Sequence, residues 1–358
     1  MPLLINNDVA KEILSMTDCV EVLEAAFREE GEGTGANRTK SNIHIPTSDP
    51  DRWYRYCTME GGLRDAGIAA IRIKSDIVSW PLYQGIRREN KYCVKPGKFC
   101  GLILLFSAEN GELLAILNDG YIQHMRVGGT AGVAARYMAR ENASVVGILG
   151  SGGMAETHLE AYAVVRSLLR AKVYSPNRER RESYARRMAG KLGIEVTPVE
   201  NPADVFRGSD IVASCTDANE PIISAKWLED GMHFTCVRTR EVGKDSFRRV
   251  DRYVSYRSEM ALNHFTTPED HRPLSWGGSN PQHMSTVRLV PEKKRHHLTD
   301  VLVGRAPARE SEKELNMFES EGTGVQFAAV AHRVYSLARE RGLGQELPLE
   351  WFLQDIRD

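Results

Sequence analysis

Hydrophobic positions in the first third of the chain follow an alternating pattern. Several short segments between turn residues alternate apolar with polar side chains or run apolar, which is typical of strands that face a core on one side. Glu109-Asn-Gly-Glu favours a hairpin. Residues 7–30 have apolar positions on one helical face and predict a helix. We expect a mostly antiparallel sheet from residues 42–45, 53–57, 68–74, 101–107 and 113–117.

In the middle of the chain, continuous apolar runs replace this alternation. Such runs are typical of parallel strands that are buried on both faces. Residues 145–149 and 171–175 flank a helical pattern over 154–169, which predicts a βαβ unit. Other elements are expected at strands 209–216 and 231–237, at a helix over 127–139, and at an amphipathic helix over 325–341 that ends at Gly342.

The two patterns predict an α/β protein with two domains, in agreement with a length of 358 residues. One is a Rossmann-type dinucleotide-binding domain over residues 126–318. The other is a discontinuous α+β domain formed from residues 1–125 and 319–358, because the last helix is expected to return to the first segment.

A glycine-rich turn joins the strand at 145–149 to its helix. Gly150 allows the tight turn, Gly152 lets the backbone approach a pyrophosphate, and Ala155 keeps the helix close to its strand. The diphosphate would lie at the helix N-terminus, where free N–H groups and the helix dipole favour negative charge. The residues expected to hold the cofactor here are Gly150, Ser151, Gly152, Gly153, Met154 and Ala155.

The end of the second strand bears on the choice of cofactor. An acidic residue about 20 positions beyond the glycine turn normally binds the ribose of NAD, and this chain has none there. Ser175, Asn177 and Arg178 are placed instead to bind a 2′-phosphate, with Arg180 or Arg181 as a second cation. This favours NADP(H) over NAD(H), although such arginines are also typical of a solvated helix start.

The amino-acid composition of the chain limits the kinds of binding partner that can be expected. The chain is 42% hydrophobic with a formal net charge of −1, which gives no support for a nucleic-acid or membrane partner. It has no apolar run long enough to span a membrane and no signal-peptide pattern, so we expect a cytoplasmic protein. The six cysteines lack metal-ligand spacing. No metal site is expected either from the irregularly spaced His264, His271, His283, His296 and His297.

Several motifs occur in a characteristic order. They are Arg38 at the start of the first long strand, Lys74 in Gly67-Ile-Ala-Ala-Ile-Arg-Ile-Lys, Arg126 in Gln123-His-Met-Arg-Val-Gly-Gly-Thr-Ala-Gly, the glycine turn, Cys215-Thr216 and Gly231-Met-His233. This ordered set resembles the ornithine cyclodeaminase and mu-crystallin family almost from end to end. The resemblance implies that the discontinuous domain binds substrate and forms a homodimer. Further cofactor contacts are expected from Cys215, Thr216 and Val237.

Three cations come from distant segments that the two-domain arrangement would bring to one cleft. Arg38, Lys74 and Arg126 suit the carboxylate of an amino or imino acid. Desolvation and neighbouring cations would lower the pKa of Lys74 and make proton transfer with a substrate nitrogen feasible near neutral pH. Glu60 lies near the position of a substrate-binding glutamate in the cyclodeaminases, and the alternative for it is a solvated strand end.

Two positions depart from the cyclodeaminase pattern. Arg240 stands where those enzymes carry a catalytic aspartate, and an arginine cannot accept a proton. The adjacent Glu241 would point to the opposite face of a strand. Phe327 stands where many relatives have an aspartate. The loss of two acids predicts a substrate less cationic than ornithine.

Segments 75–100 and 263–297 are longer than the family's core elements and rich in Trp, Tyr, His and Arg. We expect them to wall the substrate pocket; ordinary surface insertions are the alternative. The side chains expected to set substrate choice are Trp80, Tyr83, Arg87, Arg88 and Lys91.

Three functions follow from these observations. The first is an NAD(P)H-dependent oxidoreductase that reduces an imino acid or oxidises the amino acid, with an amino or imino acid as its small-molecule partner. The second is a cyclodeaminase-type lyase that keeps its cofactor bound and expels ammonia from a diamino acid. The third is a non-catalytic nucleotide- or ligand-binding protein of the mu-crystallin type, against which the retained Lys74 and Arg126 argue.

Overall fold

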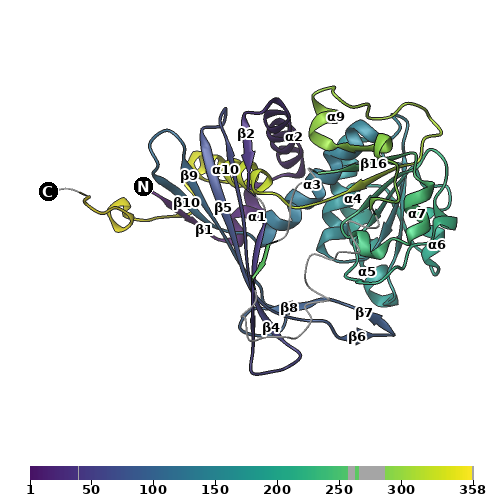
Figure 1. Ribbon diagram of the computed structural model, residues 1–358, viewed down its shortest axis with the longest axis horizontal. Helices are drawn as coiled ribbons and strands as arrows, with labels where there is room; N and C mark the ends of the chain where they lie inside the picture. Colours follow the sequence, from purple (N-terminus) through teal and green to yellow (C-terminus); the bar gives the residue numbers. More distant parts are fainter. Residues whose placement is uncertain (39, 257–262, 266–286, 357–358) are drawn as a thin grey trace.

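The protein has two domains, each built on its own sheet, with helix α3 (Gly120–Met138) between them (Figure 1). The computed structural model describes residues 1–38, 40–256, 263–265 and 287–356, and for 263–265 only the backbone. The expected boundary at Arg126 falls within α3, and the expected boundary at residue 319 falls at the end of β19 (Asn316–Glu319), a strand of the second sheet. The division into 1–125 with 319–358 and 126–318 stays a prediction.

The first sheet confirms the expected, mostly antiparallel arrangement. Its strands follow the order β17-β3-β4-β5-β9-β10-β1-β20, with β2 paired to β4 and β8 paired to β5. Two of its pairs are parallel, β1 with β10 and β17 with β3. The strands are β1 (Leu3–Ile5), β2 (Gly35–Asn37), β3 (Ser41–Pro46), β4 (Trp53–Leu63), β5 (Ile68–Ser79), β8 (Asn90–Tyr92), β9 (Cys100–Ser107), β10 (Leu113–Asn118), β17 (Asn263–Phe265) and β20 (Gln345–Glu346).

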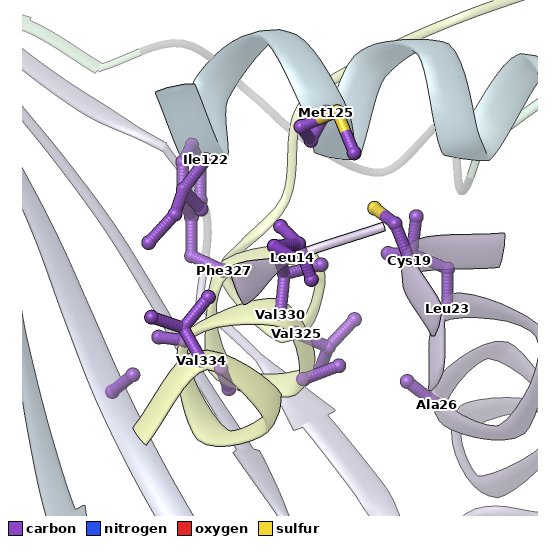
Figure 2. Close-up of a cluster of buried hydrophobic side chains, with 14 of the residues drawn as sticks. Leu14, Cys19, Leu23, Ala26, Ile122, Met125, Val325, Phe327, Val330 and Val334 are labelled. Carbon is purple, nitrogen blue, oxygen red and sulfur yellow. The ribbon is translucent and has the colours of Figure 1, made fainter. Parts of the chain in front are cut away.

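Helices cover one face of this sheet. Helix α10 (Gly324–Arg341) packs on β4 and β5, and α2 (Met16–Glu32) packs on α10 and α3. The helical character expected over 7–30 is confirmed, but it is divided between two helices. Helix α1 (Asn7–Ile13) ends before Ser15, whose side chain accepts a hydrogen bond from the Asp18 N–H at 3.0 Å and so starts α2. Figure 2 shows the core that these helices share, which includes Leu14, Cys19, Leu23, Ile122, Met125, Val325, Phe327, Val330 and Val334.

The second sheet confirms the Rossmann-type domain. All eight of its strands are parallel, in the order β13-β12-β11-β14-β15-β19-β16-β18. Besides β19, they are β11 (Val145–Leu149), β12 (Arg170–Tyr174), β13 (Glu195–Pro198), β14 (Ile211–Ser214), β15 (His233–Cys236), β16 (Arg252–Ser255) and β18 (Arg295–His297). The helices are α4 (Gly153–Val165), α5 (Arg178–Leu192), α6 (Pro202–Phe206), α7 (Lys244–Arg249) and α9 (Leu298–Leu302), with short 3-10 turns at Ala225–Trp227, Thr239–Glu241, Glu292–Lys294 and, near the C-terminus, Leu349–Phe352.

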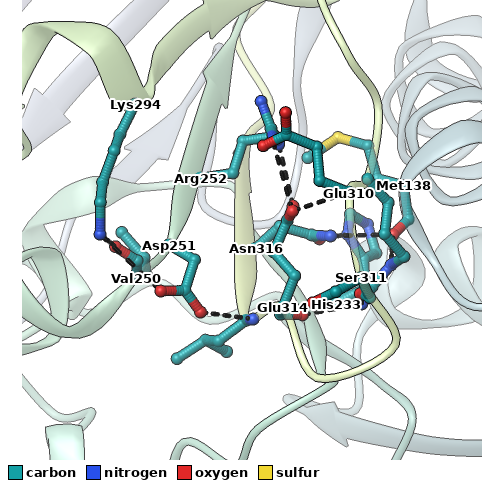
Figure 3. Close-up of polar contacts among 12 residues, drawn as sticks. Met138, His233, Val250, Asp251, Arg252, Lys294, Glu310, Ser311, Glu314 and Asn316 are labelled. Carbon is teal, nitrogen blue, oxygen red and sulfur yellow. Dashed lines mark hydrogen bonds and ion pairs between the residues drawn. The ribbon is translucent and has the colours of Figure 1, made fainter.

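A buried polar network fastens the end of α3 to this sheet (Figure 3). The side-chain amide of Asn316 donates to the Met138 carbonyl at 2.9 Å, and its oxygen lies 2.6 Å from Nδ1 of His233. Burial lowers the pKa of His233 to about 3, so the imidazole is neutral. The histidine of the Gly231-Met-His233 motif therefore has a structural place, away from the cleft described below.

Residues 80–99, here called the arm, follow β5 and extend toward the second domain (Figure 1), and within the arm β8 pairs back onto β5. The arm contains the hairpin of β6 (Leu82–Tyr83) and β7 (Ile86–Arg87). Its tip is joined to the loop after β14, because the Asn219 N–H donates to the Arg87 carbonyl at 2.9 Å and Arg88 lies 3.5 Å from Asp217. In the described part of the chain, no helix is both long and apolar enough to cross a membrane.

Candidate active site

A cleft of about 2390 Å³ lies between the two domains. On the nucleotide side it follows the carboxyl ends of β11, β12, β14, β15 and β19. Open α/β sheets bind their ligands at this edge. The other walls come from β4, β5, α3 and the arm.

The glycine turn after β11 has the geometry of a phosphate cradle. Gly150 has φ +105°, and a methyl group there would lie 2.6 Å from the Cys215 carbonyl oxygen. Gly152 is the N-cap of α4, and a methyl group there would meet open space. The backbone at Gly152, at the start of α4, is therefore open to close approach by a ligand, which suits a pyrophosphate.

Most residues predicted to hold the cofactor line the cleft. Ala155 does not, because it is fully buried beneath the turn, where its carbonyl accepts a hydrogen bond from the Tyr184 hydroxyl at 2.9 Å. Arg178 does not, because its side chain is 76% exposed and pairs with Glu182 at 2.7 Å. The ten that do are Gly150, Ser151, Gly152, Gly153, Met154, Ser175, Asn177, Cys215, Thr216 and Val237.

At the end of β12, the polar side chains predicted to bind a 2′-phosphate have different partners. The Asn177 side chain accepts a hydrogen bond from the Arg180 N–H at 2.9 Å and caps α5. Arg181 is buried, donating to the Ser175 carbonyl at 3.1 Å and pairing with Glu200 at 2.5 Å. Among the arginines of this segment, Arg180 lines the cleft.

Lys74 lies on the inward face of β5 and lines the cleft. It is 8% exposed, and its Nζ is 2.7 Å from Oδ2 of Asp76. Burial, then the neighbouring charges of Arg55 and Lys91, lower the pKa of Lys74 well below its ordinary value, against the opposing effect of Asp76. The amine can therefore release or take up a proton nearer neutral pH than a free lysine.

Arg126 lies in α3 at the floor of the cleft and is 5% exposed. Its guanidinium donates to Gln326 Oε1 at 2.8 Å and to Gln123 Oε1 at 2.9 Å, and it stacks over the ring of Phe327 at 4.8 Å. Among the described residues it has no carboxylate partner, and its Nε has no hydrogen-bond partner. Burial, then Arg72, lower the pKa of Arg126 to about 9. A carboxylate ligand is the partner that this group lacks.

The structure places Arg38 and Glu60 together, but outside the residues that line the cleft. Their side chains pair at 2.9 Å, and Arg38 is 81% exposed. Cleft-lining cations that sequence reasoning missed are Lys40, Arg55 and Arg72. A signal was present in β5, where Arg72, Lys74 and Asp76 alternate with apolar or small residues and so share the inward face.

The arm lines the cleft with several of the side chains expected from segment 75–100, namely Tyr83, Arg88 and Lys91; Trp80 and Arg87 do not line it. Sequence reasoning missed Glu89, whose carboxylate lies 3.3 Å from Arg55 of the first domain and 3.3 Å from Arg238 of the second. Although burial opposes ionisation, Arg55 and Arg238 hold the pKa of Glu89 well below its ordinary value. Glu89 is thus an ionised link between the two domains.

Arg240, which stands where the cyclodeaminases carry an aspartate, lines the cleft. Burial, then Arg238, lower its pKa. Glu241 points the other way, into the core beside the Ser214 hydroxyl, and burial raises its pKa to about 7. The opposite orientation is confirmed, but the backbone here is a 3-10 turn and not the expected strand.

Across the described ranges, no group of three or more His, Cys, Asp or Glu side chains is placed to hold a metal ion. His271 and His283 lie outside the described residues, as does most of segment 263–297, and no side chain is described for His264. His296 and His297 lie on β18 at the edge of the nucleotide sheet.

A parallel sheet with a glycine turn at its carboxyl edge, facing a second domain that presents buried cations, defines a two-domain dinucleotide-binding protein. The model of the ornithine cyclodeaminase/mu-crystallin family matches residues 82–342, and the chain belongs to that family.

The proteins that this chain resembles include dehydrogenases, imino acid reductases and cyclodeaminases. The alanine dehydrogenase of Archaeoglobus fulgidus is 26% identical over 76% of this chain and 84% of its own. A Δ1-pyrroline-2-carboxylate reductase of Bacillus cereus is 27% identical over 69% of this chain and 74% of its own. The structure of the Thermococcus litoralis Δ1-pyrroline-2-carboxylate reductase with NADH and L-proline superposes with a TM-score of 0.78 at 26% identity, covering 96% of this chain and 100% of that one.

Proposed function

We propose that this protein is an NAD(P)H-dependent oxidoreductase that interconverts an imino acid and an amino acid, as a ketimine reductase or an amino acid dehydrogenase. The observation that carries the proposal is the position of Lys74 and Arg126, buried cations that line the same cleft as the glycine turn. Lys74 has Asp76 as its counter-charge, but burying Arg126 without one is costly, and the α-carboxylate of an amino acid would supply it. The names of the relatives support the same class of reaction.

In the proposed reaction, each residue of the cleft has its own role. A bound nicotinamide supplies or accepts the hydride at the carbon that carries the nitrogen. Arg126 binds the carboxylate and fixes the orientation of the substrate. Lys74, held by Asp76 at 2.7 Å, gives a proton to the substrate nitrogen in reduction and takes one in oxidation. The arm covers part of the cleft, and the hydrogen bond of the Asn219 N–H to the Arg87 carbonyl holds it against the second domain.

For the cofactor, a preference for NADP(H) over NAD(H) is part of the proposal. It is supported by the lack of an acid at the end of β12 and by the presence of Ser175 and Arg180 on the cleft wall there. Arg180→Ala is expected to weaken NADPH binding about tenfold while leaving NADH binding nearly unchanged, because one charge-assisted contact to the 2′-phosphate is lost. Equal affinities for the two cofactors in the wild type would contradict the preference.

The cyclodeaminase alternative has a specific observation against it. On the cleft wall where a diamino acid would need an acid to receive its side-chain amine, this chain presents Arg240. A cation repels the ornithine side chain and cannot take its proton. The mu-crystallin-type alternative predicts ligand binding without turnover.

The deciding experiment follows absorbance of the reduced nicotinamide with imino acids, amino acids and ornithine, and measures ammonia release in parallel. Stoichiometric cofactor consumption is the expected result. Ammonia and proline from ornithine without net cofactor change would establish the cyclodeaminase instead. Lys74→Ala is expected to abolish turnover while NADPH affinity stays nearly intact; Lys244→Ala, at an exposed position outside the cleft, is the matched control. Loss of NADPH binding in Lys74→Ala would refute its assigned role.

We also propose that the protein is a homodimer formed through the second face of the first sheet. Leu4, Ile116, Leu104 and Ile71 are cross-strand neighbours in one apolar row. Leu4 is 40% exposed, and Ile71, Leu104 and Ile116 are each partly exposed. An apolar sheet face of this kind is typical of an interface. Light scattering should give a dimer for the wild type and a monomer for Leu104→Lys; a monomeric wild type would contradict the proposal.

A further inference from the structure

A series of charged contacts runs from the first domain through the arm to the second domain. It begins at Lys74 of β5, whose Nζ lies 2.7 Å from Oδ2 of Asp76. The same oxygen accepts a hydrogen bond from Arg55 of β4 at 2.9 Å. Arg55 also lies 3.3 Å from Glu89 of the arm, and Glu89 lies 3.3 Å from Arg238 of the second domain. Each of the two carboxylates is thus shared between cations on both of its sides.

Beyond Arg238, the contacts reach the loop of residues 215–219 after β14, here called the β14 loop. Arg238 donates to the Asn219 side-chain oxygen at 3.1 Å, and the Asn219 N–H donates to the Arg87 carbonyl of the arm at 2.9 Å. All five residues of this loop line the cleft, and Thr216 among them is a predicted cofactor contact. The series therefore has the predicted proton donor at one end and the predicted cofactor site at the other.

Glu89 is the point at which the series crosses from one domain to the other. Its side chain is 12% exposed, so solvent screens its ion pairs only weakly. Although burial opposes ionisation, Arg55 and Arg238 hold the pKa of Glu89 well below its ordinary value. The carboxylate is therefore charged at neutral pH. Separating it from either arginine would leave a buried charge without its partner, which is costly.

Glu89 also acts on the charge of Lys74. The charged and titratable groups that face Lys74 come from its own strand, from β4 and from the arm; they are Arg72, Asp76, Arg55, its cross-strand neighbour Cys57, Lys91 and Glu89. Burial, then Arg55 and Lys91, lower the pKa of Lys74. The two acids, Asp76 and Glu89, raise it. The protonation of Lys74 therefore depends on the position of the arm, which carries both Lys91 and Glu89.

We propose that Glu89 is a positioning residue, which joins Lys74 to the β14 loop and so sets how the substrate nitrogen and the cofactor meet in the cleft. This inference rests on the proposed oxidoreductase function. Glu89 acts through its neighbours: Arg55 and Asp76 transmit its position to the amine, and Arg238 transmits it to the loop. Small displacements of reacting groups have large effects on rate, so the loss of this link slows the reaction.

Glu89→Gln tests the proposal, because it removes the charge and nearly keeps the size of the side chain. With the full-length protein, kcat and KM are measured for the imino acid that the wild type reduces fastest. We expect kcat to fall about tenfold or more, the effect of one charge-assisted contact. KM should change less, because Arg126 is unaltered and still binds the carboxylate. An unchanged kcat would overturn the proposal.

The pH profile separates positioning from a general loss of stability. Lys74 is the acid in reduction, so kcat/KM falls as the pH rises through the pKa of its amine. Removing the negative charge of Glu89 lowers that pKa, so the fall should occur at lower pH in Glu89→Gln. A fall at the wild-type pH would overturn the proposed action on Lys74.

Two further variants make the comparison specific. Arg238→Gln breaks the link on the other side of Glu89 and keeps the groups around Lys74, so kcat should fall while the pH profile stays in place. Glu314→Gln is the matched control, because Glu314 is a buried acid that pairs with Arg252 at 2.9 Å outside the cleft. It should keep both kcat and the pH profile. A loss of kcat in this control as large as in Glu89→Gln would show a general effect of removing a buried ion pair and would overturn the proposal.

Hydrogen exchange tests the link between the domains without any turnover. Exchange is followed by mass spectrometry in the cofactor-free protein, in the peptide that contains Asn219. In Glu89→Gln this peptide should exchange about tenfold faster than in the wild type, and a peptide from β11 should exchange at the same rate. Faster exchange without turnover of any substrate would support the link and refute only the oxidoreductase. Equal exchange in the two proteins would overturn the link.

Discussion

Arg126→Lys tests how the cleft recognises a carboxylate. The guanidinium is fixed by Gln123 and Gln326 and stacked on Phe327, so its free N–H groups have one orientation in the cleft. Gly322 leaves room for it, since a methyl group there would lie 2.9 Å from Nη1. Lysine keeps the positive charge but replaces this planar fork with a single flexible donor.

The expected loss can be estimated from the hydrogen bonds. A bidentate contact has two charge-assisted hydrogen bonds, each contributing about 1.5–3 kcal/mol, and lysine retains one of them. The substitution should therefore cost about 1.5–3 kcal/mol, or a factor of roughly 10–150 in kcat/KM. The cofactor turn at Gly150 is a separate part of the cleft wall, so NADPH affinity should stay within about threefold of the wild type.

Two assays on the same preparations give the answer. Steady-state kinetics with the preferred imino acid measures kcat/KM, and fluorescence titration measures the Kd of NADPH. Arg136→Lys is the control, because Arg136 lies on the same helix but pairs with Glu24 away from the cleft. If Arg126→Lys keeps kcat/KM within about threefold of the wild type, or loses cofactor affinity as much as turnover, the assignment of Arg126 to the carboxylate is wrong.

Three further predictions concern the nucleotide domain. Gly150→Ala should weaken cofactor binding about tenfold or more, because alanine at φ +105° would bring its methyl group against the Cys215 carbonyl. In the control Gly190→Ala the methyl group meets open space, so this variant should bind the cofactor normally. Equal cofactor Kd values for the two variants would refute the reasoning. Asn316→Leu leaves the buried imidazole N–H of His233 unpaired and removes one of two side-chain hydrogen bonds to the Met138 carbonyl, which also accepts from Arg309 at 2.7 Å (Figure 3). Urea denaturation should therefore show a loss of about 1–3 kcal/mol, and a loss below about 0.5 would contradict it. Burial raises the folded-state pKa of Glu241 from 4.5 to about 7, so the contribution of this carboxyl to the free energy of unfolding falls as the pH rises from 4.5 to 7. Glu241→Gln should therefore stabilise the protein by up to roughly 3 kcal/mol at pH 8 and by much less at pH 5. An equal effect at both pH values would show that the pKa of Glu241 is not raised.

The elements that follow local rules were predictable from the chain alone. Five strands of the first sheet alternate or run apolar and four strands of the second, β11, β12, β14 and β15, run apolar, so these could be anticipated, whereas β13, β16, β18 and β19 were not predicted. The break at Ser15 was missed because the apolar face continues across it, although a serine followed by Asp18 is an N-cap signal. The parallel addition of β17 to β3 was not predictable, because it joins segments more than 200 residues apart.

The residues of the candidate site also differ in how far they could be predicted from the sequence. Gly150, Lys74 and Arg126 stand in motifs whose residue types match their chemistry, and all three line the cleft. Arg38 has the same chemistry, but its side chain points to solvent and pairs with Glu60. Glu89 stands in no motif, and its importance comes from the two domains that it joins.

The sequence by itself determined the class of this protein, because strand periodicity, the glycine turn and the order of motifs are local properties of the chain. Only the tertiary structure decided which charged groups share the cleft. Arg55 and Arg238 stand in no motif, and they become significant because folding places them around Asp76 and Glu89. Electrostatic energy depends on distance and burial, neither of which is encoded in the neighbouring residues of any one segment.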